Sequence, residues 1–193
     1  YVDAGATLTI GPGVEVSNGG YWFYVDGGVN ATGAAFTGST YMAARSGGQL
    51  NLSNCQVTGN DIQYQAGSRG TVSGCTFTTA PLKYYSPDVP IIGCTFRGTD
   101  PIYTYPALVP ELFDNTFAGS GVSTIHVAGT LSTNVSWQTL GTATRYSVDN
   151  VLTVPLGLTL IIGPGVEVYN VGVWFWVDGV VDATGAAFTG NTS

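Results

Sequence analysis

The sequence predicts an all-β solenoid, a chain wound into stacked coils of about 20 residues each. The fragments GAAFTGS, NCQVTGN, GCTFTTA, GCTFRGT and DNTFAGS each place Phe or Val two residues after a small residue, Cys or Asn, and this pattern returns every 19 to 21 positions. Between the fragments, stretches such as TLTI and QLNL alternate apolar and polar residues, which is typical of strands with one buried face. Frequent Gly-containing turns leave no room for long helices.

A longer repeat encloses these coils. Residues 1–41 align without a gap on residues 153–193 with 28 identities, including IGPGVEV and ATGAAFTG in both copies. The long repeat is therefore a 152-residue period, which corresponds to about seven coils. We expect residues 1–193 to form one continuous solenoid whose two ends, 1–41 and 153–193, are copies of the same segment.

Stacking places equivalent residues of successive coils in columns, because each strand pairs with the same strand one coil further on. The spacing predicts two buried columns. One is a core column of Phe36, Val57, Phe77, Phe96 and Phe117, continued by Trp137 and later by Phe188. The other is a column of small residues: Ala34, Cys55, Cys75, Cys94 and Asn115.

The interval between Trp137 and Val168 is about ten residues longer than one coil. We therefore expect an external loop near residues 139–150. The three cysteines are one coil apart, a spacing that indicates buried column members instead of a metal-binding knuckle. Two neighbouring cysteines could form one disulfide, and the count alone does not decide whether they do.

Two segments of the second copy carry a resemblance to a known family. TRYSVDNVLTVPLGLTLIIGPGVEV (144–168) and WVDGVVDATGAAFTG (176–190) are similar to motifs of the secreted and cell-surface right-handed parallel β-helix repeat proteins of bacteria and archaea. The resemblance implies a right-handed parallel β-helix in an adhesin stalk, a surface layer or a filament. It implies little about activity, since the same fold also carries polysaccharide lyases.

The composition of the chain argues against two classes of partner, nucleic acids and membranes. Charged residues make up 9 % of the chain, and a net charge of −7 includes only five scattered basic residues, so we expect no nucleic acid partner. No apolar run approaches the roughly 20 residues that span a bilayer, and we expect no membrane span in this segment. The chain begins at Tyr1 within a repeat, and we expect it to be either a mature segment or a part of a longer protein.

The sequence does not favour catalysis, and we assign no catalytic, metal or cofactor residue. Arg69 and Arg97 are separated by a distance that is not a whole number of coils, and no acidic residues are paired as a lyase would require. The only histidine, His126, lies in the strand-like stretch STIHVAG and is expected to be a half-buried strand residue. The acidic residues that could serve a lyase occur singly and not in pairs: Asp61, Asp88, Asp100 and Asp114.

An ice-binding function is also disfavoured, because the threonine columns are interrupted.

Four sequons make glycosylation a candidate modification in a secreted protein. They begin at Asn30, Asn51, Asn134 and Asn191.

Two aromatic runs, YWFYVDG (21–27) and VWFWVDG (173–179), recur one long period apart. Strand alternation predicts that Tyr21, Phe23, Val25, Val173 and Phe175 point inward, whereas four large rings point outward. We consider three interpretations of the outward rings: a cover formed by the loop near 139–150 or by another edge of the same coil, a lateral contact within a fibre, or a platform for glycans. The outward rings are Trp22, Tyr24, Trp174 and Trp176.

The leading hypothesis is a non-enzymatic extracellular structural protein, a repeat unit of a cell-surface stalk or filament. Its partners are expected to be copies of itself, stacked head to tail and in lateral contact. The alternative is an adhesin that binds glycans through the outward aromatics. A polysaccharide lyase and an ice-binding protein are the less favoured hypotheses.

Overall fold

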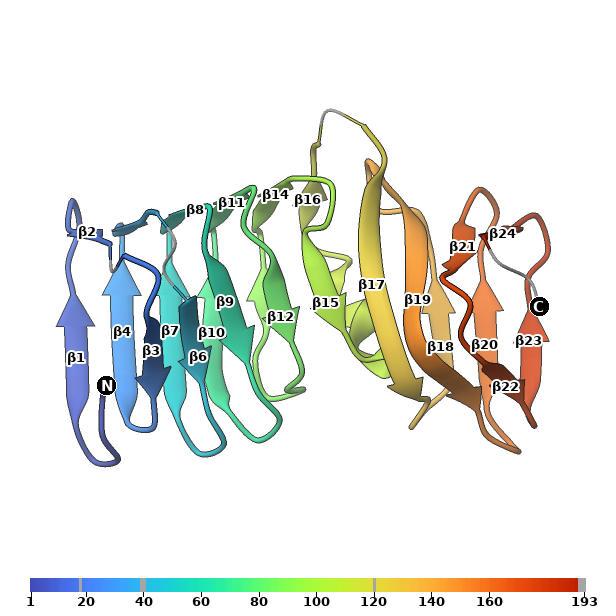
Figure 1. Cartoon of the computed structure of the whole chain (residues 1–193), viewed down its shortest axis with the longest axis horizontal. Coiled ribbons are helices and arrows are strands. Elements are labelled where there is room, and N and C mark those ends of the chain that lie inside the picture. Colours follow the sequence, from blue (N-terminus) through green and yellow to red (C-terminus); the bar gives the residue numbers. More distant parts are fainter. Residues whose placement is uncertain (18, 39–40, 120, 191–193) are drawn as a thin grey trace.

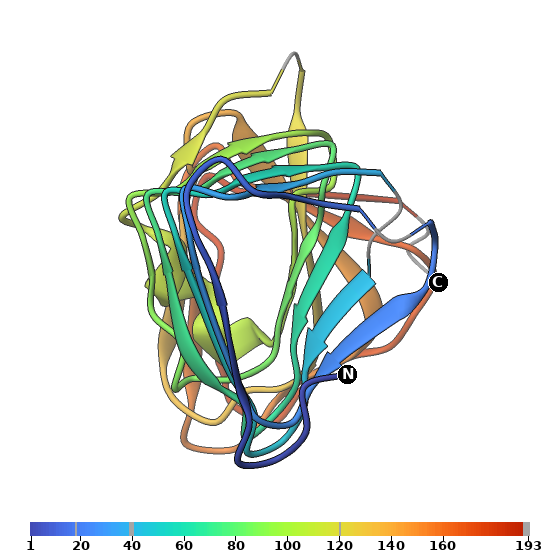
Figure 2. The ribbon, with the colours of Figure 1, turned by 90° about the vertical axis from the view of Figure 1, so that its left-hand side faces the viewer.

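The structure, a computed structural model, describes residues 1–17, 19–38, 41–119 and 121–190. It is a parallel β-solenoid of about nine turns of about 21 residues each. The turns stack along one axis (Figure 1) and superpose around a common interior when viewed along it (Figure 2). The predicted all-β parallel solenoid is confirmed.

Four parallel sheets run along the axis of the described chain. The five-stranded sheet consists of β1 (Thr7–Ile10), β4 (Gly28–Thr32), β7 (Gln49–Ser53), β10 (Arg69–Ser73) and β13 (Ile91–Ile92). The six-stranded sheet consists of β2 (Glu15–Val16), β5 (Ala35–Phe36), β8 (Gln56–Thr58), β11 (Thr76–Thr78), β14 (Thr95–Arg97) and β16 (Thr116–Phe117).

The ten-stranded sheet consists of β3 (Trp22–Val25), β6 (Tyr41–Ala44), β9 (Asp61–Tyr64), β12 (Leu82–Tyr84), β15 (Ile102–Thr104), β17 (Ser123–Thr130), β19 (Ala143–Val154), β21 (Glu167–Asn170) and β24 (Ala187–Gly190), with β22 (Phe175–Val177) beside β19. The three-stranded sheet consists of β18 (Val135–Trp137), β20 (Thr159–Ile162) and β23 (Val180–Asp182).

The core column forms the inner face of the six-stranded sheet. Phe36 pairs with Val57, and Phe77, Phe96 and Phe117 follow in register, all buried. The rings of Phe77 and Phe96 stack with centroids 4.9 Å apart, and those of Phe96 and Phe117 are 5.1 Å apart. Each buried ring contributes about 1.5–3 kcal/mol of transfer free energy.

A sharp corner precedes Ala34 and each of the three cysteines of the small-residue column. At four successive turns the corner residue has a positive φ, which Gly adopts without strain and Asn tolerates. The residue that follows points into the crowded corner, which explains why Ala or Cys occupies that position. The corner residues are Gly33, Asn54, Gly74 and Gly93.

A 3₁₀ helix, η1 (Pro106–Leu112), lies between β13 and β18, where regular turns carry a strand of the five-stranded sheet. Pro106 and Pro110 lack the N–H groups that a ladder needs, so this stretch cannot continue the sheet. The helix buries Leu108, Val109 and Leu112 in the same core and so preserves the stacking.

The external loop expected near 139–150 is replaced by a long strand. Residues 143–154 form β19, which pairs with β17 on one side and with β21 and β22 on the other. The register between β17 and β19 shifts between Ser123 and Thr124 and again between Val127 and Gly129, and Asp149, Asn150 and Val151 are exposed at the second shift. The surplus residues lengthen two strands instead of forming a separate loop.

Two expected members of the core column lie elsewhere. Trp137 is fully buried, but it lies on β18 beside Ile162 of β20, and its ring stacks on Tyr146 with centroids 4.9 Å apart. Phe188 is 48 % exposed, because β24 is the last strand of its sheet among the described residues and no later turn of that part of the chain covers its ring.

Two buried tyrosines in register on β9 and β12 provide a test of the interior. Tyr64 Oη donates a hydrogen bond to the Leu50 carbonyl at 3.0 Å, whereas Tyr84 Oη is buried without a partner in the described chain. We expect Tyr64→Phe to lower the free energy of unfolding by about 1 kcal/mol and Tyr84→Phe to leave it equal or raise it by up to about 1 kcal/mol. Urea denaturation of the two variants checks this, and an equal loss in both would contradict the assignment.

Candidate functional site

The outer face of the ten-stranded sheet gathers aromatic and charged side chains. Side chains alternate along a strand and in-register pairing repeats each position one turn on, so a single outward position forms a continuous column. One such column contains Lys83 and His126, which pair with carboxylates of neighbouring turns. It consists of Tyr24, Ala43, Gln63, Lys83, Tyr103, His126, Ser147, Tyr169 and Thr189.

Trp22 and Tyr24 lie on this face, as strand alternation predicts. Their rings stack with centroids 5.7 Å apart and planes 7° apart, and Tyr41 of the next turn stacks on Trp22 at 5.1 Å. The guanidinium of Arg45 lies over the rings of Tyr24, at 4.9 Å, and Tyr1, at 5.3 Å. Neighbouring turns therefore provide a partial cover, and Trp22 remains 44 % exposed.

Tyr21 differs from the expectation that it points inward. The strand β3 begins only at Trp22, and the Tyr21 side chain is 77 % exposed. Val25, at the other end of the same strand, is fully buried as expected.

Trp174 and Trp176 repeat the first aromatic pair at the other end of the solenoid. Their rings stack with centroids 5.5 Å apart and planes 23° apart, but the side chains are 68 % and 53 % exposed. Nothing equivalent to Tyr41 or Arg45 covers them in the described chain. The cover expected from residues 139–150 is absent because those residues form a turn and β19.

Three ion pairs connect neighbouring turns on this face: Arg45 with Asp26, Lys83 with Asp61, and Arg145 with Glu167. The hydrogen bond from Arg45 lowers the pKa of Asp26, and hydrogen bonds from Thr189 and Arg145 lower the pKa of Glu167. Both carboxylates are therefore favoured in their charged, paired form.

His126 is the centre of a cluster that the sequence did not predict. Its Nδ1 lies 2.7 Å from Asp149 Oδ2, and its Nε2 lies 3.0 Å from Asp100 Oδ1. The imidazole also stacks on Tyr103, with centroids 4.2 Å apart. Asp100 and Asp149 are 26 and 23 residues from His126, and neither separation equals the regular coil length, so counting by whole coils gave no signal for this grouping.

Each imidazole nitrogen of His126 lies within hydrogen-bond distance of one carboxylate, Asp149 at Nδ1 and Asp100 at Nε2. Ser147 Oγ donates to Asp149 Oδ1 at 2.6 Å, which ties the hydroxyl to the carboxylate and not to the imidazole. Burial, together with the nearby Asp100 and Asp149 carboxylates, raises the pKa of Tyr103. The cluster acts as a polar clamp between three turns.

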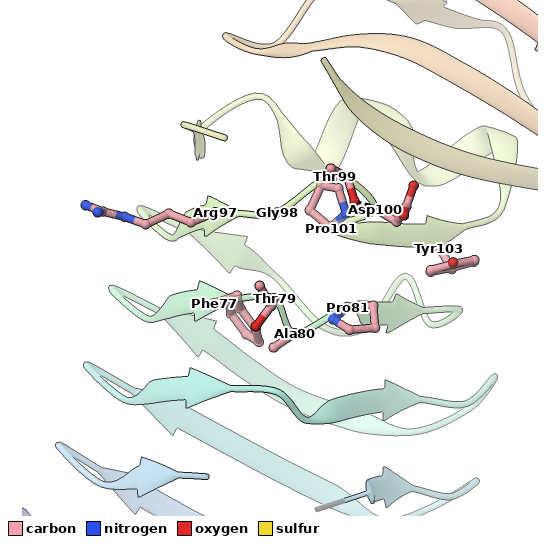
Figure 3. Close-up of a pocket in the computed structure, with 10 residues that line it drawn as sticks. All are labelled: Phe77, Thr79, Ala80, Pro81, Arg97, Gly98, Thr99, Asp100, Pro101 and Tyr103. Carbon is pink, nitrogen blue, oxygen red and sulfur yellow. Dashed lines mark hydrogen bonds between the residues drawn. The ribbon is translucent and has the colours of Figure 1, made fainter. Parts of the chain in front are cut away.

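A shallow hollow of about 270 Å³ lies beside this cluster, between the turns that contain Thr79 and Thr99. Figure 3 shows Asp100 and Tyr103 at one end of the hollow, whereas the Arg97 side chain extends away from it. The polar groups around the hollow therefore do not converge on one point. In the described residues, no three His, Cys, Asp or Glu side chains are arranged to hold a metal ion.

The small-residue column is buried at Ala34 and at all three cysteines, which are free thiols. The Cys55 N–H donates to Cys75 Sγ at 3.3 Å, and Asn115 Oδ1 accepts a hydrogen bond from the Cys94 N–H at 2.9 Å. The flanking thiols of Cys55 and Cys94, together with burial, raise the pKa of Cys75. The hydrogen bonds with Cys75 lower the pKa of Cys55 to about 6 and also lower that of Cys94, and all three thiols are buried.

Three of the four sequon asparagines belong to the described chain. Asn30 and Asn51 are partners on neighbouring strands, and Asn51 Nδ2 donates to Asn30 Oδ1 at 2.7 Å. Asn134 is exposed before β18, where its Oδ1 accepts a hydrogen bond from the Thr159 N–H at 2.8 Å. Asn191 lies outside the described residues.

The two ends of the solenoid expose complementary parts of one repeated segment. In the first copy Leu8 and Val14 are 39 % and 45 % exposed, whereas their counterparts in the second copy are buried. In the second copy Val177 and Phe188 are each 48 % exposed, whereas their counterparts Val25 and Phe36 are buried. Each copy thus buries the residues that the other leaves open.

Comparison with known proteins identified no relative: no protein-family model, no curated protein and no solved structure gives a significant match. The structure therefore supports the solenoid fold, while the resemblance to secreted β-helix repeat proteins depends on the motifs alone. The described residues contain no helix long and apolar enough to cross a membrane.

The ion pairs between turns predict a loss of stability in acid. Because the pKa values of Asp26 and Glu167 are lower in the folded chain, their stabilisation is present above their ordinary pKa values and disappears as the pH falls through the folded ones. We expect the urea midpoint to fall between about pH 5 and pH 3. This fall should be smaller in the Asp26→Asn, Glu167→Gln double variant.

The matched control is Asp88→Asn, which removes an exposed carboxylate that takes part in no ion pair of the described chain. It should retain the acid sensitivity of the parent. Equal pH profiles for the parent and the double variant would contradict the role of these two pairs.

Proposed function

We propose that this chain is part of a non-enzymatic extracellular structural protein in which 152-residue units continue head to tail as a stalk or filament. The observation that carries the proposal is the reciprocal burial of the two copies. Leu8 and Val14 are exposed at one end, Val177 and Phe188 at the other, and their counterparts inside the stack are buried. A continued stack would bury both sets.

The free strand edges at both ends support the same proposal. The strands β1, β2 and β3 are the outermost members of their sheets at one end, and β23 and β24 are outermost at the other. Unpaired parallel edges of this kind invite pairing with another strand. In a continued solenoid every turn covers the edge of its neighbour, as in other repeat proteins.

The absence of enzymatic activity is also a proposal, supported by the chemistry of the polar face. The His126 nitrogens are both engaged by carboxylates, and the three buried thiols are protected by the core. The bases Arg45, Lys83 and Arg145 are engaged in ion pairs between turns. The charged groups of this face thus connect neighbouring turns of the solenoid.

A chain with one additional unit tests the structural proposal. We expect residues 1–152 placed before Tyr1 to give a single rod that is longer by about 34 Å, because seven further turns each rise about 4.8 Å. Electron microscopy of the extended and parent chains measures the difference. The control inserts a flexible Gly/Ser linker between the two units and should give two hinged particles.

Particles that do not lengthen, or units that hinge freely without the linker, would contradict the proposal. Its extracellular part is tested with antibodies against the chain, which should label intact cells of the source organism. Labelling that requires permeabilised cells would contradict that part.

A second candidate function is glycan binding by the exposed aromatics, which would make the protein an adhesin. The stacked rings of Trp174 and Trp176 favour it, because they form a broad, exposed apolar surface on an otherwise polar face. We expect Trp174→Ala to lower binding on a glycan array at least tenfold if this surface carries recognition, with rod assembly unchanged. Tyr169→Ala, on the same face, is the control, and an array without binding by the parent chain would exclude this candidate.

A further inference from the structure

We infer that the open C-terminal end of the solenoid is a docking surface for a turn with the sequence of residues 41–58, supplied by the following copy. In this joint a β6-like strand covers β22 and a β8-like strand covers β24. The inference depends on the proposed head-to-tail function and specifies the partner and register of the joint. It excludes the alternative in which the N-terminal turn of a separate chain occupies the same surface.

The C-terminal end presents a hollow of about 450 Å³, lined by apolar side chains together with Asn170 and Thr189, that no turn of the described chain fills. Phe175 and Phe188 line it together with Val168 and Val173. The adjacent Val177 is 48 % exposed, as is Phe188. An end of this composition loses unfavourable contact with water when another turn covers it.

The first copy shows which residues fit such a surface. The strands β3, β4 and β5 lie one long period before β22, β23 and β24, and they are covered by β6, β7 and β8. There Met42 pairs with Phe23, Leu50 with Val29, and Val57 with Phe36.

The three covering residues are fully buried in this chain. Phe175, Val181 and Phe188 are identical to the residues that these three cover. The same set of side chains therefore fits the C-terminal end.

The outer face of the C-terminal end also lacks, in the described chain, the contacts that residues 41–58 make in the first copy. Trp22 stacks on Tyr41, and Asp26 forms an ion pair with Arg45, so both partners come from one following turn. Trp174 and Asp178 occupy the corresponding positions at the C-terminal end. In the described chain Trp174 is 68 % exposed and Asp178 takes part in no ion pair.

The N-terminal turn is a poor substitute for this partner. Its strand β1 has a second copy, β20, which shows what lies on the open side of β1 inside a stack. That neighbour is β18, which places Val135 beside Leu160 and Trp137 beside Ile162. The open side of β1 is thus matched to a β18-like strand, whereas β23 is matched to a β7-like strand.

An extended chain tests the inference. Residues 41–58 are added directly after Thr192, so that the added Tyr takes the position of Ser193 and keeps the 152-residue period. We expect the thermal midpoint to rise on the order of 5 °C, because a repeat protein gains stability from each added interface. Iodide quenching of tryptophan fluorescence should fall as Trp174 approaches the 44 % exposure of Trp22.

The matched control carries the same extension with Met42→Asp, Leu50→Asp and Val57→Asp in the added segment only. It keeps the length and the outward residues but cannot enter the apolar end, and it should behave like the parent chain. A second comparison adds residues 1–17 after Thr192 in place of residues 41–58, which presents the N-terminal turn to the same surface.

Equal midpoints and quenching for the extended chain and its control would overturn the inference. An equal or larger rise with residues 1–17 would also overturn it and would indicate stacking of separate chains. If the extension docks as expected but chains with additional units form no rods, the proposed filament function fails while the docking surface stands.

Discussion

The hydrogen-bonded pairing of parallel strands one turn apart is the interaction on which every other feature of this solenoid depends. It holds each turn about 4.8 Å from the next and places equivalent residues directly above one another. A residue type that recurs every coil must therefore pack against its own kind. For phenylalanine this arrangement is favourable, because rings in register stack on one another, as Phe77, Phe96 and Phe117 do.

The same constraint explains why the chain contains so few charges. A repeated Lys or Asp would place like charges about 4.8 Å apart along a column, which destabilises a sheet. The chain instead uses neutral hydroxyls and amides and pairs opposite charges from neighbouring turns, as with Arg145 and Glu167. His126 extends this principle, because its single ring connects carboxylates from two directions.

The sequence predicted the features that follow from a constant coil length. The strand faces, the phenylalanine column and the small residues at the corners all repeat at that spacing, and each can be found by counting. Counting failed where the coil length changes. The segment with Pro106 and Pro110 forms the helix η1 where regular turns have a strand. The residues expected to form a loop near 139–150 lie largely in the strand β19, which contains a bulge at Asp149–Val151.

The His126 cluster could not be predicted for the same reason, since Asp149 belongs to that bulge. The exposure of Tyr21 depended on where β3 begins, which alternation alone does not determine. By contrast, the outward placement of Trp22 and Trp174 needed only the alternation of a strand and was visible in the sequence.

The direction of the main-chain hydrogen bonds has a mechanical consequence. In a parallel solenoid these bonds run along the long axis, so tension along the axis is carried in series by the bonds at every interface between turns. Bending, by contrast, compresses one sheet and is shared among many turns and the packed rings inside. The ion pairs between turns connect the same interfaces and so add to the bonds that carry an axial load.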